Sequence, residues 1–223
     1  VDKGAVWVAV VKDAVLVTVS KENPALNYIL ANGVKRSTFM GIYIYGNITT
    51  WGEVVGRPEI KDDVHVYTRS DSCGAAEIWA KYLGHKQEDL KGIGVYGDPG
   101  LADAVKNDRL GIGFNNLNYA YDANTSKPVE GLAIAPIDID GDGILEANES
   151  FYGTRDAIMN AIAAGNYPSP PAREENLVTK GKFEGLTAEF VRWILTDGQK
   201  YAPEVGYIPL PQERQAEQLG KLG

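Results

Sequence analysis

The sequence has a single cysteine, Cys73, which excludes an internal disulfide. No apolar stretch reaches the roughly 18 residues that a membrane-spanning helix requires, and no leader precedes Val1. We therefore expect a soluble chain that is either mature or a shortened form of a longer protein. Basic residues are also scarce, at 22 against 30 acidic ones, and the formal charge of −8 argues against nonspecific binding to nucleic acid or anionic membranes.

The clearest chemical feature is the acidic segment 138–149, DIDGDGILEANE, which satisfies the calcium-loop pattern D-x-[DN]-x-[DN]-G-x₅-E. Carboxylates at alternate positions face one centre, and Gly143 allows the sharp turn that follows them. The carboxylates would repel one another in an empty loop, so a hard, oxygen-seeking cation is the natural compensation. The pattern predicts a Ca²⁺ site with these ligands: Asp138, Asp140, Asp142, the Ile144 carbonyl, Glu149 and, through a water molecule, Glu146.

The alternative for this segment is a solvated acidic turn, because Asp and Gly are ordinary loop residues. Residues 131–137, which precede it, form a short apolar run that contains a proline. Such a run predicts a strand rather than the entering helix of a paired EF-hand. We therefore expect calcium to act as a structural clamp rather than as a switch.

The order of the expected elements indicates the fold class. Residues 5–20 are a β-branched run interrupted by Lys12 and Asp13, which predicts a long strand that leaves one layer and enters another. Further strands are expected at 64–68, 110–114 and 176–179, and helices at 74–83, 99–108, 155–164 and 186–195. Strands that alternate with helices predict an α/β architecture. A chain of 223 residues with 44% apolar composition can bury one large core or two modest ones.

A second chemical feature is the junction 69–75, RSDSCGA, between an expected strand and the first turn of a helix. Backbone N–H groups are unpaired at a helix N-terminus and the helix dipole is positive there, so the junction suits an oxyanion, with Arg69 adding a bidentate fork. Asp71 can orient that fork or accept a proton from the ligand. The alternative is that Asp71 or Ser72 only caps the helix.

The same residues give less support to an enzymatic function than to anion binding. Cys73 at a helix N-terminus could act as a nucleophile, but it needs a base, and neither His65 nor His85 is obviously within reach. The glycine pairs in KGIGVYG and LGIGF lack a dinucleotide fingerprint, and the sequence has no Gly-Lys-Ser/Thr phosphate loop. We expect a binding protein and not an enzyme.

The segment RSDSCG, followed by a helix, resembles the R-x-D-x-S-G-T segment of the phosphate-binding proteins of ABC transporters, which have the type II periplasmic-binding-protein fold. Further stretches resemble this family in the same order along nearly the whole chain: KDAVLVTVSKENP with NITTWGEV, LGIGFNNLNYAYD, YPSPPAREENLVTKGKFEG and FVRWILTDGQKYAPEVGYIPLP. The resemblance implies a two-lobed receptor that closes over phosphate and delivers it to a membrane permease.

Carried over residue by residue, the resemblance implies that Arg69 is the charged donor and Asp71 its orienting carboxylate. Ser72, Cys73 and Gly74 would form part of the loop around the anion. The chain departs from the family where Cys73 replaces a serine and Ala75 a threonine, so two hydroxyl donors are absent. Backbone N–H donors survive both changes, and either a reduced phosphate affinity or a different oxyanion is expected.

The resemblance also implies a division of the chain. Residues 1–11 would be a first-lobe strand and crossover, 12–166 a nearly complete second lobe that carries the calcium loop, and 167–223 the C-terminal part of the first lobe. Family members open with a longer N-terminal segment, so half of the cleft is expected to be missing here. We expect a separate N-terminal segment or another copy of the chain to cover the apolar faces left open.

Two functions follow as hypotheses. The first is an extracytoplasmic solute-binding protein for phosphate or a related oxyanion in ABC-type import, with a structural calcium site. It would be periplasmic or held at the cell surface, where a lipid or membrane anchor would lie in a segment outside this chain. The second is a calcium-stabilised structural or interaction domain of the same fold without transport activity.

Overall fold

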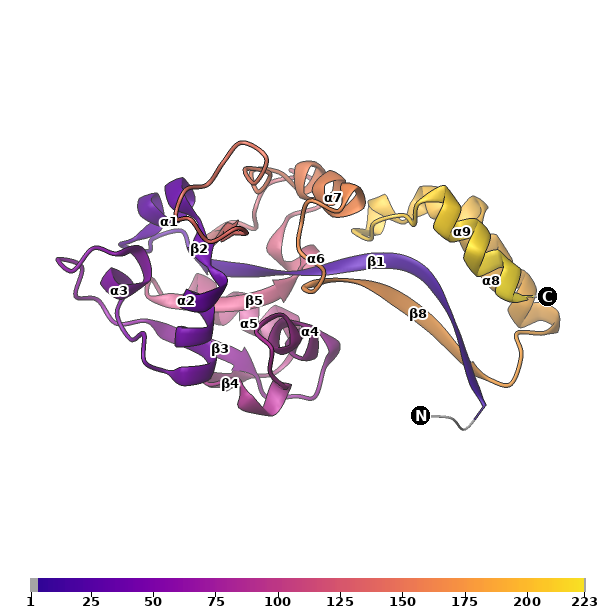
Figure 1. Ribbon diagram of the computed structural model, residues 1–223, viewed down its shortest axis with the longest axis horizontal. Coiled ribbons are helices and arrows are strands. Elements are labelled where there is room, and N and C mark those ends of the chain that lie inside the picture. Colours follow the sequence, from indigo (N-terminus) through magenta and orange to yellow (C-terminus); the bar gives the residue numbers. More distant parts are fainter. Residues whose placement is uncertain (1–3, 223) are drawn as a thin grey trace.

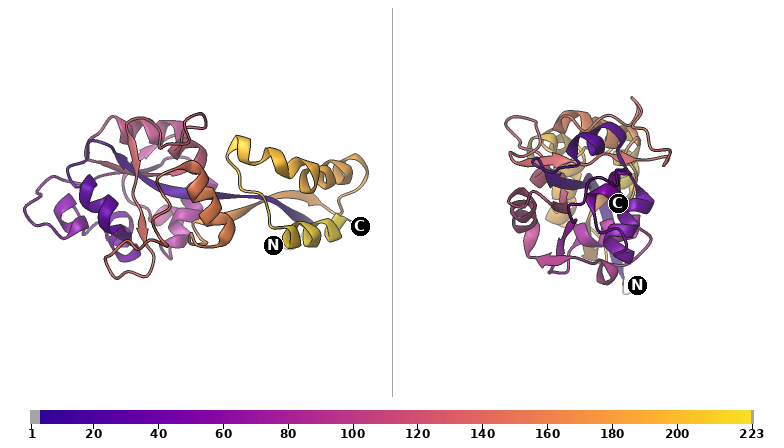
Figure 2. Two further views of the ribbon diagram at one scale, coloured as in Figure 1. Left: turned by 90° about the horizontal axis from the view of Figure 1, so that it is seen from above. Right: turned by 90° about the vertical axis from the view of Figure 1, so that its left-hand side faces the viewer.

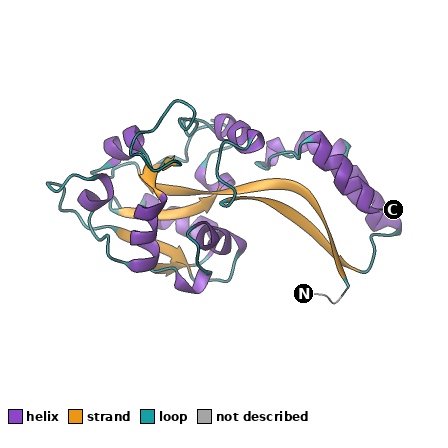
Figure 3. Ribbon diagram, viewed as in Figure 1, coloured by secondary structure: helices purple, strands orange, loops and turns teal. Residues whose placement is uncertain are grey.

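The computed structural model describes residues 4–222 and has two parts of unequal size joined by a long two-stranded ribbon (Figure 1). The ribbon consists of β1 (Ala5–Ser20) and β8 (Ala172–Lys180), which leave the larger part side by side (Figure 3). The first section of β1 pairs antiparallel with β8, and the later section pairs with two strands of the larger part. The prediction that residues 5–20 leave one layer and enter another is therefore confirmed.

The larger part contains a sheet with strand order β4-β3-β5-β1-β6. Strand β3 (His65–Arg69) runs parallel to β4 (Ile93–Val95) and β5 (Gly111–Asn116), whereas β1 is antiparallel to β5 and β6 (Leu132–Ile134). A separate parallel pair joins β2 (Val34–Lys35) to β7 (Ile137–Asp138). The helices of this part are α1 (Leu26–Asn32), α2 (Arg36–Met40), α3 (Trp51–Val55), α4 (Gly74–Tyr82), α5 (Gly97–Lys106), α6 (Leu117–Ala120) and α7 (Arg155–Ala164).

Aromatic side chains fill the core of the larger part. Trp79 on α4 is fully buried, and its ring lies 5.3 Å from that of Phe39 and 6.1 Å from that of Phe114, measured between centroids. Tyr43 contacts the same tryptophan edge-on at 5.7 Å. Side chains from helices α2 and α4 and from β5 thus meet in one core, and this packing fixes where α4 begins relative to the end of β3.

The smaller part is built on the outer section of the ribbon. Helices α8 (Gly185–Leu195) and α9 (Gln212–Leu219) flank the line of the ribbon when the molecule is seen from above (Figure 2). Its core contains Val8 and Val10 of β1, Val191 and Leu195 of α8, and Leu210. Tyr167 and Ala172 belong instead to the larger core, so the division between the two cores falls near Arg173 on β8.

The smaller part carries two sets of exposed apolar side chains. On α8, Leu186 is 87% exposed, Phe190 57% and Trp193 45%, and these residues follow one another at helical spacing. On the ribbon, Trp7 and its cross-strand neighbour Val178 are exposed as well. Clusters of exposed apolar groups of this size are typical of surfaces that meet another chain or segment.

Most of the expected elements are present, with shifted ends. The strand expected at 176–179 starts earlier, at Ala172, because the charged residues 173–175 also pair with β1. The apolar run before the acidic loop forms β6 and β7, which are separated by Ala135 and Pro136, and no helix enters the loop. Helices α1, α2, α6 and α9 were not predicted. Among residues 4–222, no helix is both long enough and apolar enough to cross a membrane.

Candidate functional site

The junction predicted to bind an anion lies where β3 ends at Arg69 and α4 begins at Gly74. Cys73 caps the helix in place of the usual hydroxyl residue, since its Sγ accepts a hydrogen bond from Ala76 N at 3.5 Å. The side-chain amide of Gln87 closes the loop, because it donates to Asp71 O at 2.7 Å and accepts from Cys73 N at 3.2 Å. Helix α4 is therefore capped and its first turn is held in place.

The N–H groups of Gly74 and Ala75 point out of this first turn. Within the described part of the chain, neither group donates a hydrogen bond to a protein acceptor. Gly74 is exposed and Ala75 is buried. These two donors, together with the positive end of the helix dipole, are what the junction offers to an anion. Ser72 is exposed beside them.

Arg69 is held by two carboxylates. Its Nε and Nη2 donate to Asp71 at 2.8 and 2.6 Å, and its Nη1 donates to Asp98 Oδ2 at 2.7 Å. The guanidinium is almost buried, with 6% of the side chain exposed. The Arg69 hydrogen bonds lower the pKa of Asp71 to about 2, and Asp71 also accepts from Gly97 N at 3.1 Å. Arg69 therefore has little of its fork free for a ligand.

Sequence reasoning missed Asp98, which reaches this site from the first turn of α5. The sequence carried a local signal for it, since an aspartate before a proline is typical of a helix start. It carried no signal that α5 would begin beside Arg69. That proximity depends on β3 and β4 pairing in parallel, with Arg69 opposite Val95.

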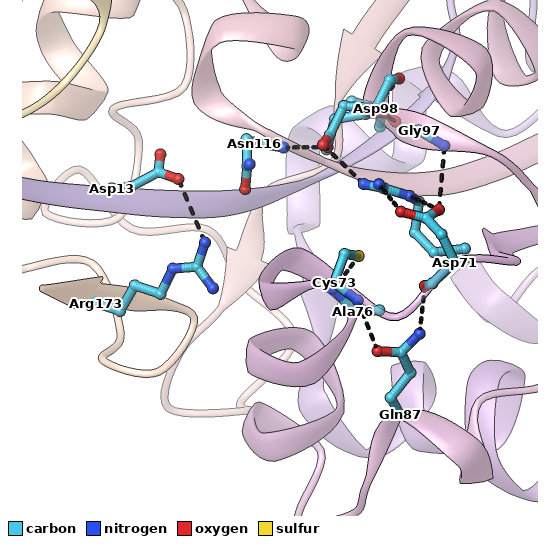
Figure 4. A network of polar contacts seen from close by, with 12 residues as sticks. Asp13, Asp71, Cys73, Ala76, Gln87, Gly97, Asp98, Asn116 and Arg173 are labelled. Atoms are coloured by element: carbon cyan, nitrogen blue, oxygen red, sulfur yellow. Dashed lines mark hydrogen bonds and ion pairs between the residues drawn. The ribbon is translucent and has the colours of Figure 1, made fainter. Parts of the chain in front are cut away.

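A second pair of charged residues approaches the junction from the ribbon. Asp13 on β1 lies opposite Arg173 on β8, and their side chains are 3.7 Å apart (Figure 4). Burial raises the pKa of Asp13 to about 6, although its hydrogen bond from Ala14 N and the charge of Arg173 both oppose the shift. Both residues were outside the predicted anion site.

The two histidines have other partners. His65 Nδ1 lies 2.7 Å from Asp108 Oδ2, and Tyr67 donates to the same carboxylate oxygen at 2.8 Å. His85 Nδ1 lies 3.5 Å from Asp89. Neither histidine forms a polar contact with Cys73 in the part of the chain that the structure describes. The arrangement around Cys73 thus provides hydrogen-bond donors for an anion and lacks a base paired with the thiol.

The acidic loop 138–149 follows β7 directly and folds around its own carboxylates. Asp138 accepts from Gly141 N at 2.7 Å through Oδ1 and from Gly143 N at 2.8 Å through Oδ2. Gly143 has φ 93°, a left-handed conformation that side chains rarely adopt, which explains the glycine at this position. Ile144 N donates to Asp142 Oδ1 at 2.8 Å, which continues the turn.

The predicted metal ligands come together in this loop as two overlapping groups, within each of which the ligand atoms lie within 4.8 Å of one another: Asp138, Asp140 and Glu149, and then Asp140, Asp142 and Glu146. Asp138 and Glu149 are only 1% and 4% exposed. Oε2 of Glu149 is buried without a hydrogen-bond partner, which is costly for an ionised carboxylate. The donor set and this orphan oxygen fit a hard cation such as Ca²⁺.

Lys35 contributes one positive charge to the rim of the same loop. Strand β2 places it opposite Asp138, and its Nζ donates to Gly141 O at 2.7 Å. An ammonium group at this distance offsets part of the negative charge of the loop. The Lys35 ammonium group would therefore compete with a bound cation. The sequence gave no indication that Lys35 lies at this loop.

One of the comparisons with known proteins identifies a family. A family model described as a PBP superfamily domain matches residues 2–198, and no curated protein matches the chain. A similar solved structure is that of a possible phosphate-binding protein from Planctomyces limnophilus, with 17% identity and a TM-score of 0.66 over 98% of this chain and 72% of that one.

Two further solved structures are similar at 18% identity and a TM-score of 0.66. One is a putative phosphate ABC transporter substrate-binding protein with bound phosphate from Clostridium perfringens, where the match covers 93% of this chain and 73% of that one. The other is an ABC-type phosphate transport receptor from Vibrio cholerae, with 95% and 75% covered. At these identities the likeness establishes the fold.

Proposed function

The chain belongs to the PBP superfamily and has the α/β, type II periplasmic-binding-protein-like fold that the sequence predicts, and from this premise we propose that it is an extracytoplasmic solute-binding protein for phosphate or a related oxyanion. The solved relatives include a transporter substrate-binding protein with bound phosphate. By analogy with them, the partner would be the permease of an ABC-type importer.

The observation that carries this proposal is the first turn of α4. Two N–H groups, on Gly74 and Ala75, have no acceptor among residues 4–222, and they lie at the end of the loop that begins with the buried and oriented Arg69. Backbone donors at a helix N-terminus bind anions without needing side-chain hydroxyls, so the replacements at Cys73 and Ala75 leave the main contacts available. Asp71 and Asp98 limit the positive charge, which favours a ligand that can donate a proton to a carboxylate.

Calorimetric titration of the whole chain with phosphate, and with sulfate for comparison, tests this function. Saturable phosphate binding is expected, and Arg69→Ala should abolish it because the loop loses its charge and its support. Arg109→Ala is the matched control, since Arg109 forms an exposed ion pair with Asp62 away from the loop. Equal phosphate affinity in the wild type and in Arg69→Ala would contradict the proposal.

We further propose that the acidic loop binds Ca²⁺ as a structural clamp. Asp138, Asp140, Asp142, Glu149 and the Ile144 carbonyl would hold the ion, and Glu146 would act through a water molecule. A ligand that binds only the folded state stabilises that state by roughly 2.7 kcal/mol when the free ligand concentration is a hundred times its Kd. Thermal unfolding in chelator and in calcium should show this increment, and Glu149→Gln should remove most of it. An unchanged calcium response in that variant would exclude the loop as the site.

One observation favours a second candidate function, a calcium-stabilised structural or interaction domain without transport activity. The Arg69 guanidinium already donates hydrogen bonds to Asp71 and Asp98, and the loop lacks two hydroxyl donors. The exposed apolar side chains on α8 and on the ribbon support a partner for the smaller part, either a separate N-terminal segment or another copy of the chain. This candidate predicts a calcium response with no phosphate affinity, so the titration above separates the two functions.

A further inference from the structure

A second guanidinium, that of Arg173, lies directly against the first turn of α4. A Cβ atom built on Gly74 would be 2.5 Å from Arg173 Nη1 and 3.1 Å from Nη2, so the guanidinium occupies the space beside the glycine backbone. Arg173 comes from β8, near the point where the ribbon enters the larger part. Figure 4 shows it facing Cys73 from the side opposite Asp71.

Arg173 differs from Arg69 in how its donors are used. The Arg69 donors make short, directed hydrogen bonds to Asp71 and Asp98. By contrast, Nη2 of Arg173 is 3.7 Å from Asp13, beyond hydrogen-bond distance. Its Nε lies 2.6 Å from Glu175 in an orientation that makes no hydrogen bond, and this nitrogen is buried without a partner. Arg173 is thus neutralised in charge but has unused hydrogen-bond donors.

The sign of the charge is also unusual for this position. The N-terminal end of a helix carries partial positive charge, and a cation placed against it is repelled. Asp13 and Glu175 flank Arg173 on the side of the ribbon and compensate part of this repulsion. They do not lie between the guanidinium and Gly74, whose N–H makes no hydrogen bond within residues 4–222. An anion that accepts from both groups would remove the conflict.

We propose that Arg173 is the cationic contact of the oxyanion at the first turn of α4, and that Arg69, locked by Asp71 and Asp98, acts as a positioning residue for the loop. This inference rests on the proposed function and assigns a residue to the same site. The anion would accept hydrogen bonds from the Arg173 guanidinium and from the N–H groups of Gly74 and Ala75. Its binding would tie the crossover ribbon to helix α4.

The test is calorimetric titration of phosphate into the whole chain and four variants. Arg173→Lys keeps the charge beside Asp13 and Glu175 but loses the planar fork, and Arg173→Gln loses both. We expect roughly ten- to hundredfold weaker phosphate binding in Arg173→Gln, as for loss of a hydrogen bond to a charged group, and an intermediate loss in Arg173→Lys. Gly74→Ala should also weaken binding, because the new Cβ displaces the guanidinium while the loop sequence is otherwise unchanged.

Arg214→Gln is the matched control for these variants. Arg214 forms an ion pair with Glu174, the neighbour of Arg173 on β8. Successive side chains of a strand point to opposite faces, so this pair is expected on the other face of the ribbon from Arg173. The affinity of Arg214→Gln for phosphate should match that of the wild type. If the unaltered chain binds phosphate, and Arg173→Lys and Gly74→Ala bind it with the same affinity, the assignment of Arg173 is overturned. The proposed function would still stand. Failure of the unaltered chain to bind phosphate would instead overturn the proposed function.

Discussion

The carboxylate of Asp98 lies 2.7 Å from Nη1 of Arg69, on the edge of the guanidinium that Asp71 leaves open. Two carboxylates thus share one arginine, and the site around them carries excess negative charge. A negative charge close to an oxyanion opposes its binding unless the ligand donates a proton to it. The balance between Arg69, Asp71 and Asp98 should therefore set both the affinity and the choice of anion.

Asp98→Asn should raise phosphate affinity by roughly three- to tenfold, because it removes one negative charge while keeping an oxygen for Arg69. Phosphate titration at low ionic strength measures this change, and added salt should reduce it. Asp103→Asn is the control, since Asp103 is exposed on the same helix and its replacement changes the net charge equally. An affinity that is the same in all three proteins would show that Asp98 does not face the ligand.

Asp13→Asn should change how stability depends on pH. Because burial raises the pKa of Asp13 to about 6 from the usual 3.8, the folded state disfavours the ionised carboxyl. The resulting destabilisation is absent below about pH 4, grows as the pH rises from about 4 to 6, and reaches at most about 3 kcal/mol above that. The asparagine variant should therefore be more stable than the wild type at pH 7 to 8 and equally stable at pH 4.

Denaturant unfolding of both proteins at several pH values measures that difference. Arg173, Glu175 and Asp98 are the charged groups that act on Asp13, and all three are retained in the variant. Asp103→Asn, on an exposed carboxylate, should show no comparable trend. A stability difference that does not vary between pH 4 and pH 8 would contradict the expected titration.

Lys35→Gln should tighten calcium binding several-fold. The ammonium group of Lys35 donates to Gly141 O inside the acidic loop, so removing it lowers the repulsion felt by a bound cation. Calcium titration followed by tryptophan fluorescence or calorimetry measures the change. Lys61→Gln removes the same charge from an exposed position and serves as the control. Weaker binding in Lys35→Gln would mean that the lysine orders the loop more than it repels the ion.

Phe190→Gln should reduce self-association. Phe190 is 57% exposed and its ring stacks on that of Trp193, with 6.2 Å between centroids, in the middle of the exposed face of α8. Sedimentation velocity over a range of concentrations should show association of the wild type and less in the variant. Glu189→Gln, on the same helix and exposed, is the control. A wild type that stays monomeric at high concentration would show that this face does not bind another copy.

Local sequence was enough to predict the parts that depend on neighbouring residues. Spacing alone indicated that the carboxylates of 138–149 would gather in one loop, and the structure brings five of them into two overlapping groups, because loop geometry follows from glycine and carboxylate placement over twelve residues. Calcium binding by this loop stays a prediction. The long β-branched run predicted the strand that serves both cores. The Arg69–Asp71 pair was also predictable, since its members are two residues apart.

Tertiary structure alone decided which distant groups join the anion site. Asp98 reaches Arg69 because β3 and β4 pair in parallel, and Arg173 reaches Gly74 because β8 pairs with β1 in one particular register. Strand register between segments some 160 residues apart depends on the packing of whole layers and has no local signal. The sequence therefore determined the chemistry that each loop contains, whereas the pairing of its strands determined which charges surround it.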